Sequence, residues 1–306
     1  MTAGLALSTH RMLHQRLAAA AYRVASTVTP WVDTAPNHAG GQAHQLLAPV
    51  LATHTHLQVA TKVGHFNERS GRAALTLGII DHHEAEMGHS ISPRFLRWQI
   101  ERACAGLRRD KLDMLFLHAP ERTGLSGLDD RLLDAFKVLE QQVRAKRIAA
   151  YGVAATREGF THGYYTVGKL DDLATKAGGA GHHLRAVQMP VNLDLDEVMR
   201  SALDGHGPIA EAAVMGWEVH ATKATYPVEV FIADSRGVVD LIAPGATLRT
   251  ASLRAVASLP GVTKVLVTTG NGERWKETVR LFNELPVDPD TIRKALDVLA
   301  DGRARG

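Results

Sequence analysis

The segment that decides the fold is LDMLFLHAP, residues 112–120, a short apolar run that ends in a histidine and a proline. A continuous apolar run of this length, bounded by turn residues, is typical of a strand that is buried on both faces of a parallel sheet. A helical pattern follows at 128–146. A strand followed by a helix is the repeating unit of parallel α/β folds. The same unit recurs on both sides of this segment.

Eight apolar runs predict strands, and helical patterns separate them. The predicted strands are 4–8, 31–33, 57–63, 114–117, 148–153, 186–190, 218–222 and 262–267. The predicted helices are 12–28, 42–51, 94–109, 128–146, 168–177, 195–215, 252–259, 273–284 and 289–300. Eight strand–helix units in 306 residues predict one (β/α)8 barrel domain over residues 1–306.

Two long stretches interrupt the regular spacing. Residues 64–93 follow the third strand and are rich in charge and histidine, and residues 226–245 follow the seventh strand. Connections that follow strands lie on the catalytic face of such a barrel. We therefore expect both stretches to be long loops over the C-terminal face that act as lids or binding loops.

Composition excludes several classes of function. A formal charge of only +3 gives no electrostatic reason to expect nucleic acid binding. The single cysteine, Cys104, fits a reducing compartment. No apolar run approaches the ~18 residues that span a bilayer, and no signal-peptide pattern opens the chain. We expect a cytoplasmic protein that acts on a small molecule, without a membrane or nucleic acid partner. The sequence does not indicate its oligomeric state.

Titratable side chains stand at the ends of three predicted strands. Asp33, Lys62 and His118 each end an apolar run, which places them at the mouth of a barrel. Burial and close partners can tune the pKa values of such groups for catalysis. The alternative is an Asp–Lys ion pair that only closes the top of the barrel.

Six segments in order along the chain resemble motifs of the aldo-keto reductases. They are WVDTAPNHAGG (31–41), ATKVG (60–64), LDMLFLHAP (112–120), KRIAAYGV (146–153), AVQMPVN (186–192) and PGVTKVLV (260–267). The resemblance implies a (β/α)8 barrel that reduces carbonyls with NADPH by means of an Asp, Tyr, Lys and His tetrad. Asp33, Lys62 and His118 match three members of that tetrad, and His38 stands where the family has its tyrosine.

The histidine changes the expected chemistry. Its reference pKa is ~6.5 against ~10 for tyrosine, and a nearby Lys62 cation would lower it further. A neutral imidazole suits proton abstraction or shuttling better than it suits proton donation. The sequence leaves open whether His38 has this role or fills a site that has lost its activity.

The cofactor contacts implied by the resemblance are only partly kept. Gln188 is retained, whereas Ala154 and Ala155 replace a Ser-Asn pair that holds the nicotinamide amide, and Gly270 replaces a phosphate-binding arginine. A helix that opens with glycines can still bind phosphate through its backbone N–H groups. The residues predicted to hold NADP(H) are Gln188, Lys223, Thr268, Gly270, Asn271, Gly272 and Arg274. An ordinary helix start and a solvated lysine are the alternatives.

The histidines of the 64–93 stretch are not spaced like metal ligands, so no metal is expected. His82 and His83 are adjacent, while His65 and His89 lie at the two ends of the stretch. They are either solvent-exposed, or one of them is brought towards a substrate.

Three functions are compatible with these residues. The first is NADP(H)-dependent interconversion of a carbonyl and an alcohol on a polar metabolite. The second is a non-redox lyase, dehydratase or isomerase in which His38 and Lys62 act as base and acid without nicotinamide. The third, a non-catalytic binding protein, is disfavoured by the joint retention of Asp33, Lys62 and His118.

Overall fold

The structure is a computed structural model that describes residues 3–28, 30–225 and 235–305. Eight strands form a closed parallel barrel in the order of the sequence, as predicted. The strands are β1 (Gly4–Ser8), β2 (Trp31–Asp33), β3 (Gln58–Val63), β4 (Leu112–His118), β5 (Ile148–Ala154), β6 (Leu184–Pro190), β7 (Glu218–Thr222) and β8 (Lys264–Val267). Each lies within two residues of its predicted bounds.

Helices follow the strands along the chain, and several were not predicted. The helices are α1 (His14–Ala25), η1 (His38–Gly41), α2 (Ala43–Thr53), α3 (Glu68–Thr76), α4 (His82–Met87), α5 (Pro93–Leu107), η2 (Pro120–Thr123), α6 (Leu128–Arg144), α7 (Arg157–Thr161), α8 (Val167–Gly178), α9 (Asp196–Leu203), α10 (Gly207–Val214), α12 (Ser235–Ile242), α13 (Leu248–Ala257), α14 (Gly272–Phe282) and α15 (Pro289–Arg305). The prediction of one helix over 195–215 is wrong. Gly205 has a φ of 76° and separates α9 from α10, because a left-handed residue cannot continue a right-handed helix.

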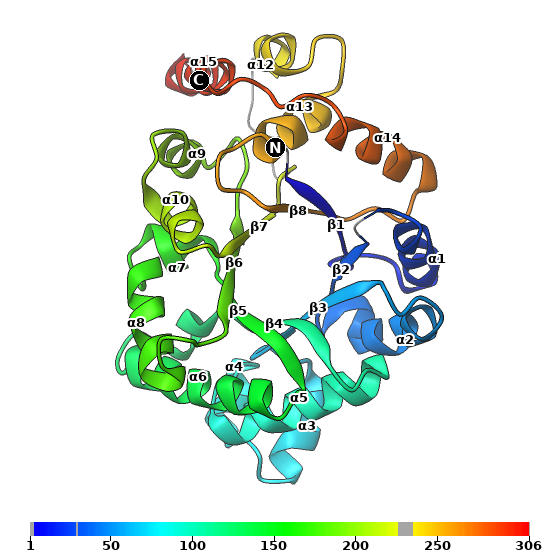
Figure 1. Cartoon of the computed structure of the whole chain (residues 1–306), viewed down its shortest axis with the longest axis vertical. Coiled ribbons are helices and arrows are strands. Elements are labelled where there is room, and N and C mark those ends of the chain that lie inside the picture. Colours follow the sequence, from blue (N-terminus) through cyan, green and yellow to red (C-terminus); the bar gives the residue numbers. More distant parts are fainter. Residues whose placement is uncertain (1–2, 29, 226–234, 306) are drawn as a thin grey trace. The chain divides into compact units, whose positions relative to one another are not determined.

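The chain forms two compact units. The larger unit comprises Leu7–Val187 and Thr268–Gly270, and the smaller unit comprises Met1–Ala6, Gln188–Val267 and Asn271–Gly306. In the larger unit, α5 packs against β3 and α6 against β5, so these helices cover the outside of the strands (Figure 1). In the smaller unit, α12 packs against both α13 and α15. The single domain over 1–306 stays a prediction.

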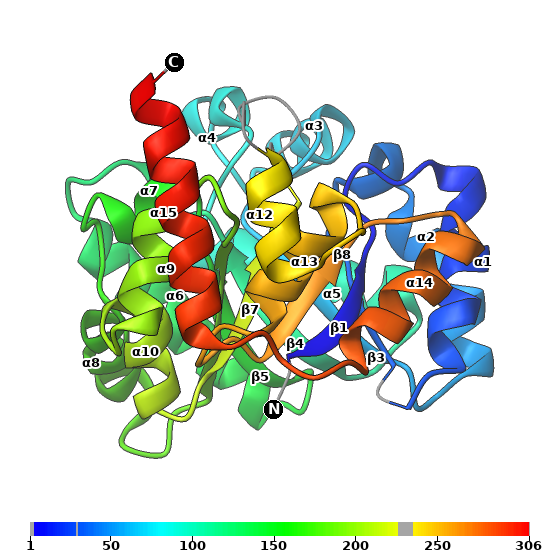
Figure 2. The same cartoon turned by 90° about the horizontal axis from the view of Figure 1, so that it is seen from above.

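The 64–93 stretch is a folded insertion rather than a bare loop. It contains α3 and α4, which lie side by side in Figure 2. Asp81 and Glu84 form a reciprocal capping box that starts α4. Phe66 and Phe95, together with smaller apolar side chains, give the insertion a hydrophobic cluster of its own. Its role as a lid or binding loop stays a prediction.

The second long stretch, 226–245, is described only in part. Residues 226–234 lie outside the described residues. The remainder was predicted as loop, but α12 occupies Ser235–Ile242.

Candidate active site

The predicted pair of Asp33 and Lys62 forms a buried ion pair in the larger unit. Lys62 Nζ lies 2.6 Å from Asp33 Oδ1 and 2.7 Å from Oδ2, and it donates a third hydrogen bond to the Thr34 carbonyl at 3.2 Å. The two side chains are only 5% and 2% exposed. An ammonium has three N–H donors, so all three have acceptors here. Burial of these charges is tolerable because each is paired.

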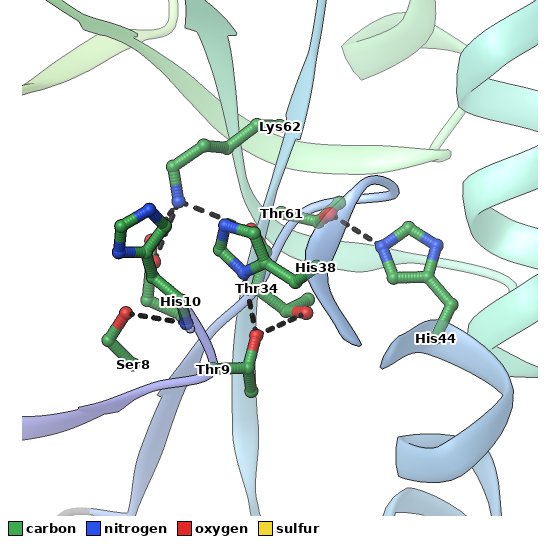
Figure 3. Close-up of polar contacts among 9 residues, drawn as sticks. Ser8, Thr9, His10, Thr34, His38, His44, Thr61 and Lys62 are labelled. Atoms are coloured by element: carbon green, nitrogen blue, oxygen red, sulfur yellow. Dashed lines mark hydrogen bonds and ion pairs between the residues drawn. The ribbon is translucent and has the colours of Figure 1, made fainter. Parts of the chain in front are cut away.

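Strand geometry aims these side chains to one side. Asp33 is in register with Ala60, two residues before Lys62, and side chains two apart on a strand share a face. Thr61 therefore points the opposite way, and its hydroxyl lies 2.8 Å from His44 Nε2 on α2 (Figure 3). His44 thus belongs to the packing behind the strand. Burial and the Lys62 charge lower its pKa to about 4.

His38 lies beside this ion pair, at the start of η1. It is buried, and its Nδ1 lies 2.8 Å from Thr9 Oγ1, which in turn donates to Thr34 Oγ1 at 2.9 Å. Burial and, next, the Lys62 cation lower the pKa of His38 to about 2. The imidazole is therefore neutral at neutral pH, which is the state expected from the sequence.

The tight turn at the end of η1 brings Gly41 against Asn67 of the insertion. Gly41 has a φ of 87°, and a Cβ there would lie 2.2 Å from Asn67 Nδ2. Only glycine fits that conformation and that approach without a rearrangement.

His118 ends β4 within a group of three histidines. The His65 ring centroid lies 5.2 Å from that of His118 and 5.4 Å from that of His89. His89 Nε2 lies 2.7 Å from the His118 carbonyl and must carry the proton, because a carbonyl only accepts. Burial and the Lys62 charge hold the pKa of His118 well below its usual value. His118 Nδ1 is buried and has no hydrogen-bond partner among the described residues.

Of the four insertion histidines, two reach the site and two do not. His65 and His89 surround His118, and burial lowers the pKa of both. His82 and His83 are exposed at the start of α4. The described residues contain no group of three or more side chains arranged to hold a metal ion.

Sequence reasoning missed three residues of this site. Thr9 is fully buried and bonded to His38, and the His10 ring centroid lies 5.4 Å from that of His38. Arg122 on η2 donates to His65 Nε2 at 2.9 Å. Their positions in the sequence could have indicated them, because Thr9 and His10 directly follow β1 and Arg122 follows β4. Residues that follow barrel strands lie on the catalytic face.

The loop after β5 is held by a buried carboxylate. Glu121 Oε1 accepts from Thr156 N and Glu121 Oε2 accepts from the Tyr165 hydroxyl, both at 2.7 Å. Ala154 is buried and, like Ala155, offers no polar side chain. The Thr156 N–H and the Tyr165 hydroxyl therefore have their hydrogen-bond acceptor within the protein, in the Glu121 carboxylate.

The segment after β8 meets two arginines of α1. Arg23 Nη2 donates to the Gly270 carbonyl at 2.9 Å, and a Cβ on Gly270 would lie 2.7 Å from Arg16 Cδ. Arg23 Nε is buried without a hydrogen-bond partner among the residues described. Thr268, two residues earlier, is exposed.

The remaining predicted cofactor residues belong to the smaller unit. Gln188 is buried in β6, while Lys223 and Arg274 are exposed. Asn271 Oδ1 accepts from Glu273 N at 2.9 Å and from Arg274 N at 3.1 Å, and thereby caps α14, whose first residue is Gly272. Two backbone donors that the sequence offered to a phosphate are therefore occupied by the cap.

Solved structures similar to this chain share its fold. A thermostable aldo-keto reductase in complex with epalrestat has a TM-score of 0.70 at 15% identity, over 96% of this chain and 94% of that one. The glycerol dehydrogenase from Gluconobacter oxydans has a TM-score of 0.68 at 16% identity, over 97% and 91%. Aldose reductase from Giardia lamblia has a TM-score of 0.62 at 14% identity, over 99% and 93%.

Comparison of the sequence with curated proteins finds no match. No helix among the described ranges is long and apolar enough to cross a membrane. The model of the aldo/keto reductase family matches residues 4–164, which is more than half of the 306 residues. The chain therefore belongs to the aldo/keto reductase family.

Proposed function

We propose that this protein is an NADP(H)-dependent oxidoreductase that interconverts a carbonyl and an alcohol on a small polar metabolite, with His38 as the group that moves the proton. The observation that carries the proposal is the position of a neutral His38 imidazole beside the buried Asp33–Lys62 pair. His118, which ends β4, is the fourth member of the proposed catalytic set.

The described residues fit a phosphate-bearing cofactor. Arg16 and Arg23 flank the Thr268–Gly270 segment, and the unpartnered Arg23 Nε is a donor suited to an anionic oxygen. The further residues proposed to hold the cofactor are Gln188, Lys223, Asn271, Gly272 and Arg274. NADP(H), when bound, supplies or accepts the hydride.

The protonation state of His38 sets the favoured direction. In alcohol oxidation, the substrate hydroxyl proton moves to the free ring nitrogen of His38 and then to water. In carbonyl reduction, His38 would have to arrive protonated, which a pKa of about 2 makes rare at pH 7. Burial and the Lys62 charge keep the pKa of His38 low, while Asp33 and the Thr34 carbonyl fix the Lys62 ammonium.

A titration of the pure protein with NADPH and NADP⁺ tests the proposal directly. Binding is followed by quenching of the fluorescence of the four tryptophans. Saturable binding supports the proposal, and no binding up to millimolar concentration overturns it. As a second test, the His38→Tyr variant should reduce a generic aldehyde at least as well as the wild type.

One observation favours a second candidate, a non-redox lyase, dehydratase or isomerase. The loop after β5 carries no polar side chain at Ala154 and Ala155, and Glu121 occupies the Thr156 N–H. A neutral His38 could abstract a proton from a metabolite without nicotinamide. Substrate turnover in the absence of any nicotinamide nucleotide would identify this function.

A further inference from the structure

We propose that Thr9 is a positioning residue that holds His38 in the Nδ1–H tautomer, so that Nε2 presents a lone pair to the substrate. The tautomer of His38 and its bond to Thr9 do not depend on which reaction is catalysed. The consequence for turnover does rest on the proposed oxidoreductase function.

A count of hydroxyl protons fixes the direction of the hydrogen bonds. Thr9 has one hydroxyl proton and two polar neighbours, namely Thr34 Oγ1 at 2.9 Å and His38 Nδ1 at 2.8 Å. The geometry has the Thr9 hydroxyl donating to Thr34. Thr9 Oγ1 can then only accept from His38, so Nδ1 carries the proton. A neutral imidazole has one N–H, and Nε2 is therefore an acceptor.

The Lys62 charge favours the same tautomer. Figure 3 shows the second ring nitrogen of His38 on the side where the Lys62 ammonium lies, away from Thr9. A cation on that side disfavours a proton on the nitrogen that faces it. All three of the Lys62 N–H groups are bonded to Asp33 and Thr34, so Lys62 does not donate to the His38 ring.

The backbone holds Thr9 rigidly in place. Thr9 N donates to the Asp33 carbonyl at 3.0 Å, and Thr34 N donates to the Ala60 carbonyl at 2.9 Å. Thr9 and Thr34 are fully buried, so water cannot easily replace the hydroxyl bonds. A buried donor or acceptor that loses its partner is costly, and this cost opposes the other tautomer. Thr34 also connects the Asp33–Lys62 ion pair to the Thr9–His38 contact. Its carbonyl accepts from Lys62 and its hydroxyl accepts from Thr9.

The tautomer decides what His38 can do. With the proton on Nδ1, Nε2 can accept a substrate hydroxyl proton. With the proton on Nε2, the same atom could only donate a hydrogen bond, and alcohol oxidation would lack its base. Thr9 thus acts through His38 and needs no contact with the substrate.

Two-dimensional ¹H–¹⁵N NMR of ¹⁵N-histidine-labelled protein reads the tautomer without any assay of activity. The His38 signals are assigned by their loss in a His38→Gln variant. We expect a protonated Nδ1 and an unprotonated Nε2 in the wild type. An unprotonated Nδ1 overturns the proposal, whether or not any variant folds.

Three variants separate positioning from simple stability. Thr9→Val removes the hydroxyl at nearly constant shape and should give a mixture of tautomers, whereas Thr9→Ser should restore the wild-type signals. The matched control is Thr61→Val, which removes the equivalent hydroxyl–imidazole contact with His44 on the opposite face of β3. That change should leave the His38 signals unaltered. Unchanged His38 signals in a folded Thr9→Val variant overturn the proposal.

Kinetics then tests the consequence. Turnover scales with the competent fraction of His38, so kcat of alcohol oxidation should fall on the order of 10-fold in Thr9→Val, with KM little changed. Thr9→Ser should recover it. If NADP(H) fails to bind while the NMR signals behave as expected, the oxidoreductase function fails and the tautomer assignment stands. If kcat is unaffected although the tautomers mix, the positioning role fails.

Discussion

The ends of strands β2 to β4 and the loop after β5 differ in whether their polar groups have hydrogen-bond partners within the protein. At the strand ends, the buried His118 Nδ1 has no hydrogen-bond partner among the described residues, and it lies near the buried Asp33–Lys62 pair. After β5, Glu121 satisfies Thr156 N and the Tyr165 hydroxyl, and the alanines add nothing polar. One buried ring nitrogen at the strand ends thus lacks a partner among the described residues, while the polar groups of the loop after β5 are bonded within the protein.

The largest expected effect comes from removing the proton-moving ring. His38→Gln should lower turnover by roughly 10²–10⁴-fold, the usual contribution of a general acid or base. Steady-state kinetics checks this, with His83→Gln as the control because His83 is exposed on the insertion. Equal activity of the two variants would remove His38 from the mechanism.

The ion pair should matter for stability as well as for activity. Lys62→Met leaves Asp33 buried without its partner and should lower the free energy of unfolding by about 3–5 kcal/mol. The double variant Asp33→Asn/Lys62→Met should regain most of that stability in urea denaturation but no activity. If the single variant is as stable as the wild type, the pair is not the buried, mutually dependent unit described above.

The buried neutral histidines should make the fold acid-sensitive. The folded-state pKa is about 2 for His38 and about 4 for His44 and His89, against ~6.5 in an unfolded chain. The unfolded chain therefore binds more protons, and stability is lost as pH falls below about 6.5. Each group contributes up to about 1.4 kcal/mol per pH unit between its two pKa values. His89→Gln should reduce the slope of unfolding free energy against pH; an unchanged slope argues against a depressed His89 pKa.

The smallest effect concerns the loop after β5. Ala155→Asn places an amide where the family holds the nicotinamide, and one added hydrogen bond is worth about 1 kcal/mol. We expect NADPH to bind about fivefold more tightly, as measured by tryptophan fluorescence. Weaker binding would mean that this loop does not face the nicotinamide.

Much of the fold follows from local pattern. The eight strands were predictable because each apolar run is short and bounded by polar or turn residues. The helices inside the insertion were not, because α3 and α4 are short and are stabilised by a capping box and a small cluster around Phe66 and Phe95. The break between α9 and α10 lies at two left-handed glycines, Gly205 and Gly207, which a helical pattern alone does not reveal.

The site was predictable where it follows strand ends and not where it depends on the insertion. Asp33, Lys62 and His118 stand at positions that any such barrel brings together. His65 and His89 lie near His118 because they pair with each other in an antiparallel bridge. His82 and His83 take no part in that bridge and lie away from His118. The Asn271 cap of α14 likewise could not be predicted, because it depends on where the Asn271 side chain points.

The most direct test of a neutral His38 is the pH dependence of both reaction directions between pH 6 and pH 8. With a His38 pKa of about 2, alcohol oxidation should be nearly independent of pH, because the base is already deprotonated. Carbonyl reduction should fall about tenfold for each unit of rising pH, because the acid form becomes that much rarer. A reduction rate that levels off below an apparent pKa near 6.5 would show an ordinary imidazole that donates its proton, and would contradict this account.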